Sequence, residues 1–290
     1  MDDSRPASGG FVLGALGILG FSFSLPATRL AVADLDPFFV AFGRAAVAAV
    51  FALVALRILR APRPTRAQWP SLAIVAGGVV IGFPLLTSLA LQHETSAHGA
   101  VVIAILPAAT AVVAVPRAGE HPTPRFWLAV AAGTVAVLAF VVVQDGVSGV
   151  SSSDLYFLLS VVVCAFGYAE GGALARTLGG GATICWALIL SAPLTFTVGV
   201  VAAATTGVDA SATAWLGFAY VCAISMFLAF FAWYAGLARG GVARIGQVQL
   251  AQPVLTLLWS ALLLGESVGP ATVATAVLVL ACVAITQRAR

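Results

Sequence analysis

The chain has 290 residues, of which 61% are hydrophobic and 9% charged, and its formal net charge at pH 7 is +3. About a quarter of the residues in a soluble domain carry charge, so this composition excludes an ordinary water-soluble fold and predicts an integral membrane protein. Most of its ten apolar stretches are long enough for a helix to cross the hydrocarbon core, which takes about 20 residues. These stretches cover roughly residues 11–33, 37–59, 69–91, 97–116, 126–143, 155–177, 183–204, 213–237, 242–264 and 269–286.

The first stretch ends in Ala31-Val32-Ala33, which is similar to the cleavage site of a signal peptide. Against cleavage, the preceding segment MDDSRPASGG carries two acidic residues and one Arg where a signal peptide has a basic region. Cleavage would also leave the first half of the chain one helix short. We therefore expect residues 11–33 to form a transmembrane helix.

The orientation in the membrane follows from the arginines, since the chain has no Lys. Arg57, Arg60, Arg63 and Arg66 lie between the second and third stretches. Because basic residues concentrate in cytoplasmic loops, this loop is expected in the cytoplasm. With ten spans, both termini are then cytoplasmic as well.

The fourth and ninth stretches share one sequence skeleton. LPAATAVVAVPRAGEHPTP (106–124) and QPVLTLLWSALLLGESVGP (252–270) both contain the pattern P-x2-T-x8-G-E-x3-P, and the prolines that begin it, Pro107 and Pro253, are 253 − 107 = 146 residues apart. We interpret this as an internal duplication, with one five-helix repeat in residues 1–145 and a second in residues 146–290.

An odd number of spans per repeat makes the second repeat start from the opposite side of the membrane. The predicted fold is therefore all-α and integral to the membrane, with ten transmembrane helices as two inverted five-helix repeats. Such symmetry is characteristic of secondary transporters, in which the two halves exchange conformations during alternating access.

The repeated skeleton suggests hinges and gates. Pro107 and Pro253 lack a backbone N–H, so they either kink their helices or only shape the packing. Glu120 and Glu266 follow glycines at predicted helix C-termini, where a carboxylate opposes the helix dipole. Another group must favour them, such as exposed N–H groups where the following helix starts. We assign these four residues a gating or structural role.

Ionisable side chains inside the spans are costly and usually face the interior of a helix bundle. Arg44 and Glu170 are expected to have a gating or structural role, and Glu170 could form a bridge with Arg176. His98, near the start of the fourth stretch, is assigned to the substrate path, with a capping or packing role as the alternative.

Two helix faces are predicted to line the substrate path. Gln249, Gln252 and Thr256 share one face of the ninth stretch at spacings of three and four residues. Phe227, Phe230 and Tyr234 share a face of the eighth, where they could stack against an aromatic ligand. The alternatives are hydrogen bonds between helices for the first face and packing for the second.

No cofactor or metal site is expected. His93 and His98 are one residue too far apart for an H-E-x-x-H zinc motif. The four cysteines lack C-x-x-C spacing, and there is no Walker motif. No basic patch with interleaved aromatic residues suggests nucleic acid. The expected partners are a small-molecule substrate and the lipid bilayer, and the oligomeric state stays open.

The two copies of five helices, each with a fourth helix that runs through Pro to a terminal Gly-Glu, resemble the EamA group of the drug/metabolite transporter superfamily. The segment DPFFVAFGRAAVAA (36–49) is similar to the second helix of that family. The resemblance implies a ten-helix exporter of small metabolites in a bacterial inner membrane, with a central cavity lined by both halves.

Within that family, the aromatic content favours the aromatic amino-acid exporters. We therefore expect a secondary transporter that exports amino acids, including aromatic ones, by alternating access. A lipid-modifying membrane enzyme and a membrane subunit without its own transport path are the alternatives. An enzyme would require a cluster of His, Asp or Ser at one membrane interface, and the sequence shows no such cluster.

Overall fold

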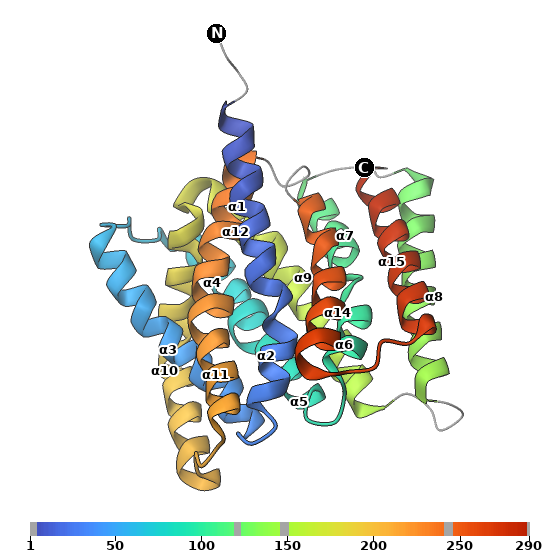
Figure 1. The fold of residues 1–290 in the computed structure, drawn as a ribbon. Coiled ribbons are helices and arrows are strands. Elements are labelled where there is room, and N and C mark those ends of the chain that lie inside the picture. The colour runs from blue at the N-terminus through green and yellow to red at the C-terminus, as the bar shows by residue number, and fades with distance from the viewer. Residues whose placement is uncertain (1–4, 119–122, 146–150, 241–245, 289–290) are drawn as a thin grey trace.

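The computed structural model describes residues 5–118, 123–145, 151–240 and 246–288, and all regular elements in these ranges are helical (Figure 1). The first half contains α1 (Arg5–Ser22), α2 (Ser24–Ala31), α3 (Pro37–Ile58), η1 (Arg66–Gln68), α4 (Trp69–Val75), η2 (Ala76–Gly82), α5 (Phe83–Ala90), α6 (Ser96–Ile103), α7 (Leu106–Ala118) and α8 (Pro124–Asp145). The second half contains α9 (Ser152–Leu178), α10 (Gly180–Thr206), α11 (Ala212–Tyr220), η4 (Val221–Leu228), α12 (Ala229–Gly240), η5 (Gly246–Leu250), α14 (Ala251–Leu264) and α15 (Pro270–Arg288).

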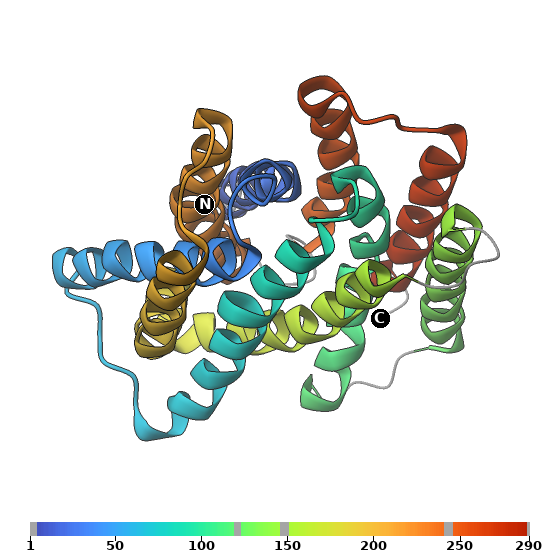
Figure 2. The same cartoon turned by 90° about the horizontal axis from the view of Figure 1, so that it is seen from below.

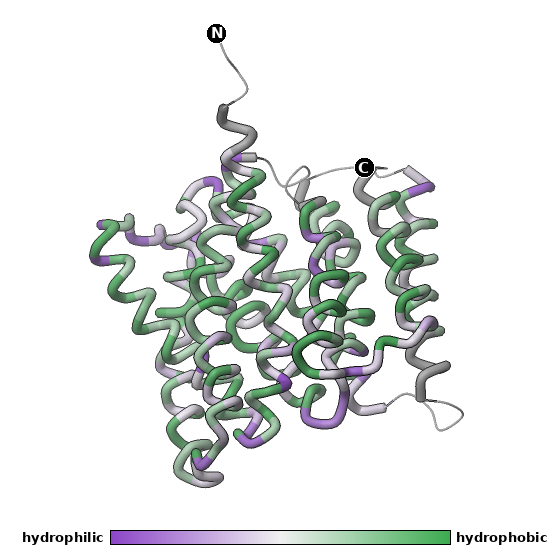
Figure 3. Tube along the Cα trace, viewed as in Figure 1, coloured by the Kyte–Doolittle hydropathy of each residue, from purple (hydrophilic) through white to green (hydrophobic). Residues whose placement is uncertain are grey.

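These elements form ten helical spans that correspond to the ten predicted stretches. Seven are long and apolar enough to cross a membrane by length and composition, and three shorter apolar helices lie within 124–137, 248–264 and 270–282. Several large apolar side chains point outward, among them Val200, Leu216 and Leu262, which are 65%, 71% and 67% exposed. Hydrophilic residues gather toward the two ends of the bundle (Figure 3). The chain is an all-α, multi-pass membrane protein, as predicted.

The spans are arranged as two inverted sets of five. Helix α1 begins and α15 ends at the same end of the bundle, which we call the termini side (Figure 1). The turns at 32–36, 91–95, 207–211 and 265–269 lie at the other end, the opposite side (Figure 1). Five spans separate the start of α1 from the start of α9, so α9 begins on the opposite side. The predicted boundary at 145/146 borders residues 146–150, which lie outside the described residues, and it stays a prediction.

Helix packing follows the repeat. Corresponding spans pack against each other, α3 against α10 and α8 against α15, at different edges of the bundle (Figures 1 and 2). Spans four and nine meet through α6 and α14. Spans one and eight meet through α1 and α12, while their counterparts six and three meet through α9 and α5. This reciprocal pattern is the one that a pseudo-two-fold axis produces.

The third and eighth spans share a further irregularity. Each contains a π-helical segment, η2 at Ala76–Gly82 and η4 at Val221–Leu228. Their first residues are 221 − 76 = 145 apart and their last 228 − 82 = 146 apart. Because π-helices are rare and frequently occur at functional sites, their matching positions direct attention to the region between these spans.

Close packing of the third and sixth spans depends on glycine. A Cβ added at Gly78 would overlap the backbone carbonyl of Val163, whereas one at the adjacent Gly77 would have no atom within 4 Å. Gly167 of α9 faces the same contact, because a Cβ there would overlap the side chain of Val79. The small residues let the two backbones approach, as they commonly do in membrane bundles.

We predict that Gly78→Ala destabilises the protein by about 1–3 kcal/mol, because the added methyl group forces α9 away from η2. The midpoint of thermal unfolding in nanodiscs should fall. Gly77→Ala is the matched control, since it makes the same change to the exposed neighbour and should leave the midpoint unchanged or raise it slightly. Equal midpoints for the two variants would contradict the packing role of Gly78.

Candidate functional site

A cavity with about 560 Å³ of empty space lies between the two halves of the chain. We call it the central cavity. Its lining comes from spans one, two, three and four of the first half and from spans six, eight and nine of the second. The lining residues are Phe21, Ser24, Leu25, Thr28, Arg44, Val79, Phe83, Pro84, Thr87, Ile103, Leu106, Cys164, Tyr168, Ser225, Met226, Phe230 and Gln252.

Several lining residues are related by the repeat. Val79 and Ser225, Pro84 and Phe230, and Leu106 and Gln252 all line the central cavity, and the members of each pair are 146 residues apart (225 − 79, 230 − 84 and 252 − 106). The offset read from the sequence skeleton therefore also relates the walls of the cavity. In two pairs the first repeat supplies an apolar side chain and the second a polar one, so the cavity is symmetric in backbone and asymmetric in chemistry.

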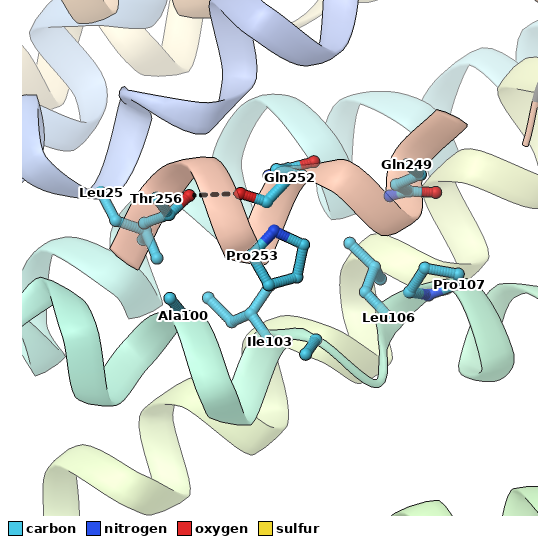
Figure 4. A pocket seen from close by; sticks show the side chains of 10 residues that line it. Leu25, Ala100, Ile103, Leu106, Pro107, Gln249, Gln252, Pro253 and Thr256 are labelled. Carbon is cyan, nitrogen blue, oxygen red and sulfur yellow. Dashed lines mark hydrogen bonds between the residues drawn. The ribbon is translucent and has the colours of Figure 1, made fainter. Parts of the chain in front are cut away.

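A smaller pocket with about 300 Å³ of empty space adjoins the central cavity between spans four and nine (Figure 4). It shares Leu25, Ile103, Leu106 and Gln252 with the cavity. The remaining lining residues are Ala100, Ala104, Pro107, Gln249, Pro253 and Thr256. The predicted polar face of span nine thus borders open space, with both prolines of the repeated skeleton beside it.

The two prolines have different local structures. In span four, α6 ends at Ile103 and α7 begins at Leu106, so the helix is interrupted directly before Pro107. In span nine, the 3-10 segment η5 passes into α14 at Ala251 without a gap, and Pro253 lies in the first turn of α14. Pro107 therefore lies in a first helical turn, where a missing N–H removes no helical hydrogen bond, whereas Pro253 follows helical residues directly. Span four is broken and span nine is continuous at equivalent places.

The three polar residues of span nine differ in their partners. The hydroxyl of Thr256 is 2.7 Å from the carbonyl oxygen of Ser22 and 2.9 Å from that of Gln252, so it donates to backbone oxygens and holds α14 against α1. Gln249 is buried and lines the smaller pocket. The Oε1 atom of Gln252 is buried and has no hydrogen-bond partner among the described residues. Gln252 therefore has a buried acceptor left for a ligand.

The structure separates the aromatic residues predicted on span eight. Phe230 lines the central cavity and its ring centroid is 4.6 Å from that of Phe21. Phe227 lines neither pocket and packs against Phe51 and Phe231, with centroid distances of 5.7 and 4.8 Å.

Tyr234 also lines neither pocket and is fully buried, against Gly171 of α9. The prediction assumed one uniform α-helix. The π-helical segment η4 ends at Leu228, so the rotation per residue changes between Phe227 and Phe230. Tyr234 lies one turn farther along, where α9 closes against α12.

The polar residues between spans are partly engaged with one another. Ser24 donates a hydrogen bond of 2.7 Å to Ser225, which joins the two halves across the cavity wall. Sequence reasoning did not identify Ser24, Ser225, Tyr168 or Cys164, because isolated residues of these types in an apolar span carry no distinctive pattern. The repeat offset applied to Val79 would have pointed to Ser225.

His98 does not line either pocket. Its Nε2 atom lies 2.6 Å from Oδ1 of Asp154, and both side chains are buried, 5% and 0% exposed. The other carboxylate oxygen of Asp154 accepts hydrogen bonds from the backbone N and the hydroxyl of Ser151, which caps the start of α9. His98 therefore joins the start of α6 to the start of α9 on the opposite side.

Glu266 also binds the start of α6. Its carboxylate accepts hydrogen bonds from the backbone N–H groups of Ser96 and Ala97, at 2.9 and 2.8 Å, and from the Ser96 hydroxyl at 2.9 Å. Gly265 has a left-handed backbone, φ 65°, that turns the chain at the end of α14. Backbone N–H groups satisfy this carboxylate, and they belong to span four of the other half. The sequence alone suggests the N–H groups at the start of the following helix instead. A helix N-terminus favours a negative charge.

The remaining predicted residues lie apart from these contacts. Glu120 is outside the described residues. Glu170 is buried in α9 and lines neither pocket, while Arg176 is exposed. Arg44 of α3 is 3% exposed, lines the central cavity and donates a hydrogen bond of 3.3 Å to the hydroxyl of Thr28.

No group of three or more His, Cys, Asp or Glu that could hold a metal occurs in the described ranges.

Comparison with known proteins gives consistent results. The profile of the EamA-like transporter family matches the chain twice, at residues 8–142 and 151–287. The chain is 49% identical over 279 residues to the "Uncharacterized transporter YdeK" of Bacillus subtilis (strain 168), with 96% of this chain and 97% of that protein covered. A solved structure described as "Crystal structure of protein" covers 97% of this chain and 99% of its own with a TM-score of 0.67 at 18% identity, which shows a shared fold alone.

We predict that Glu266→Ala loosens the contact between α14 and α6, because the change removes three hydrogen bonds to a charged acceptor, each worth roughly 1.5–3 kcal/mol. Spin labels on His93→Cys and Ser267→Cys, in a background without native cysteines, should report a longer and broader distance distribution. Both label positions are exposed turn residues of the opposite side.

Glu94→Ala is the control for this experiment, since it removes a carboxylate from the same side of the bundle that makes none of these contacts. It should leave the distribution as in the parent protein. Glu266→Gln should be intermediate, because its amide oxygen still accepts hydrogen bonds without charge. An unchanged distribution in Glu266→Ala would show that other contacts hold this side together.

Proposed function

Because the chain belongs to the EamA-like transporter family, we propose that it is a secondary transporter that exports small metabolites across the bacterial inner membrane, by alternating access through the central cavity. That it is a membrane transporter follows from the family. Transport, and not the modification of a lipid, is therefore the activity that the cavity has to explain. The substrate class, the direction and the mechanism are the proposal.

One observation carries this proposal: residues 146 apart in the sequence line the same cavity from the two halves. We propose residues 1–145 and 146–290 as the two repeats. When inverted repeats meet at a shared site, the exchange of their conformations exposes that site to one side and then to the other. The different forms of spans four and nine, one broken and one continuous, support such an exchange, with Pro107 and Pro253 as hinges.

The contacts on the opposite side are proposed as a gate in its closed position. Glu266 of span nine and Asp154 of span six both hold the start of α6, which belongs to the other repeat. His98 is thus reassigned from the substrate path to this gate. Glu120 is proposed as the repeat-related counterpart of Glu266, and Glu170 as a structural residue of α9.

The proposed substrates are amino acids, including aromatic ones. Phe21, Phe83, Tyr168 and Phe230 give the central cavity an aromatic wall, with Phe230 and Tyr168 at a centroid distance of 6.2 Å. Gln252 and Ser225 supply polar atoms on the side of the second repeat. Apolar walls with a few convergent polar groups are typical of small-molecule sites.

We predict that Phe230→Ala reduces the transport of radiolabelled phenylalanine into proteoliposomes at least about fivefold, since loss of an aromatic stacking partner costs roughly 0.5–1.5 kcal/mol beyond the area lost. Phe227→Ala is the matched control, because it removes the same ring from the same span at a position outside the cavity. Equal transport by the two variants, at equal amounts of folded protein, would remove Phe230 from the path.

We also predict cytoplasmic termini. A reporter fused after Arg290, and a second inserted between Arg60 and Arg66, should both report the cytoplasm, because arginines concentrate in these regions. The gate formed by Glu266 would then lie at the outer face of the membrane. A periplasmic signal from either reporter would reverse this orientation or change the number of spans.

A further inference from the structure

Arg44 is a buried cation that has no acidic partner within the described part of the chain. It lies seven residues after Pro37, the first residue of α3, which places it about 10 Å along the helix and inside the apolar part of the span. Its side chain is 3% exposed. No ion pair joins it to any acid among the described residues, and Thr28, its hydrogen-bond partner, is neutral. An unpaired charge in this environment is costly, so its retention in the span requires a compensating group.

The guanidinium has donors to spare. It carries five N–H donors, and the structure shows a single hydrogen bond, from Nη1 to the Thr28 hydroxyl. The Nε atom is buried without a partner. Because Arg44 lines the central cavity, these donors are beside the space that a substrate would occupy. A planar guanidinium matches a carboxylate in geometry as well as in charge.

The other residues that line the central cavity determine which sign of ligand charge the cavity would accept. None of the described lining residues is acidic, so a cationic ligand would meet Arg44 and no compensating carboxylate. Beside the cavity, the buried Oε1 atom of Gln252 has no partner among the described residues, and this neutral amide oxygen can accept from an N–H group. Phe21, Phe83 and Phe230 form an apolar wall for a hydrocarbon or aromatic tail.

We propose that Arg44 binds the carboxylate of the substrate, and that the substrate class is amphipathic monocarboxylates in which the carboxylate is required and the α-ammonium group is not. This inference rests on the proposed function, since it names the chemistry of the solute in the central cavity. It extends the proposed substrate class from amino acids to carboxylic acids of similar size, and it excludes amines that lack a carboxylate.

The test uses three ligands that differ in one group each. Phenylalanine has both charged groups, 3-phenylpropionate has only the carboxylate, and phenethylamine has only the amine. Proteoliposomes with the full-length protein should transport the first two and exclude the third. Arg44→Gln should lower transport of both carboxylates about tenfold or more, the scale expected for losing a charge-assisted hydrogen bond. Arg44→Lys should retain part of the activity.

Arg57→Gln is the matched control, because it removes the same charge from the exposed end of the same helix, and it should transport as the parent does. Transport of phenethylamine equal to that of 3-phenylpropionate would overturn the inference and leave the proposed function standing. That comparison uses the unmodified protein, so it holds even where Arg44→Gln fails to fold. Unchanged carboxylate transport in Arg44→Gln would overturn the inference as well.

A second measurement separates failure of the inference from failure of the proposed function. Cys164 lines the central cavity, and Cys185→Ala, Cys222→Ala and Cys282→Ala together leave it as the sole thiol. The rates of its modification by an anionic and by a cationic methanethiosulfonate reagent report the charge of the cavity without any substrate. Arg44→Gln should lower the ratio of anionic to cationic rates about tenfold.

The two experiments have distinct outcomes. If none of the three ligands is transported but the ratio falls, the proposed substrate class is wrong and the anion-selective cavity remains. An unchanged ratio shows that Arg44 does not determine the charge that the cavity accepts, and the inference is then wrong whatever the protein transports.

Discussion

The absence of water in the hydrocarbon core is the constraint on which this structure depends. A backbone group that leaves regular helical geometry there must find a partner inside the protein, so interruptions are tolerated only where they are buried or line a cavity. Span one breaks at Phe23, spans three and eight contain π-helical segments, span four breaks after Ile103, and span nine changes from 3-10 to α geometry at Ala251. Residues at or next to each of these places line the central cavity. The freed carbonyl of Ser22, for example, accepts the hydroxyl of Thr256.

Duplication supplies the scaffold of the cavity, and divergence between the copies supplies its chemistry. Val79 and Ser225 occupy equivalent positions, as do Leu106 and Gln252, but only the second member of each pair is polar. The position 146 residues after Arg44 is Leu190, which is 37% exposed on the outside of α10. Of the described lining residues, the one charged side chain therefore comes from the first repeat, whereas neutral polar groups come from both. A solute bound between them would be held in one orientation, although the surrounding helices are nearly symmetric.

The sequence was sufficient for the features that depend on length, composition and repetition. Ten spans, their inversion and the 146-residue offset follow from apolar runs and from a motif that occurs twice. The rotation of each helix about its axis could not be predicted, since lipid and neighbouring helices are equally apolar and a stripe such as Phe227, Phe230 and Tyr234 can face either. The π-helical segment η4 adds a local change of rotation with no clear sequence signal. The partner of Glu266 was missed because it lies 170 residues away in the chain, and the contact depends on how the helices pack.

The interruption in span four links the opposite side to the cavity. Helix α6 is held at its start by carboxylates of the second repeat, Glu266 and Asp154, and it ends at Ile103, which lines both pockets. Only Ala104 and Ile105 connect it to α7. In the proposed alternating access, α6 would tilt about these two residues without bending α7. Release of the two carboxylate contacts would let the start of α6 move outward and its end move within the cavity. The described part of span nine, residues 246–264, has no such joint at the equivalent place. Under the proposed alternating access, span four is therefore the member of the pair that we expect to move.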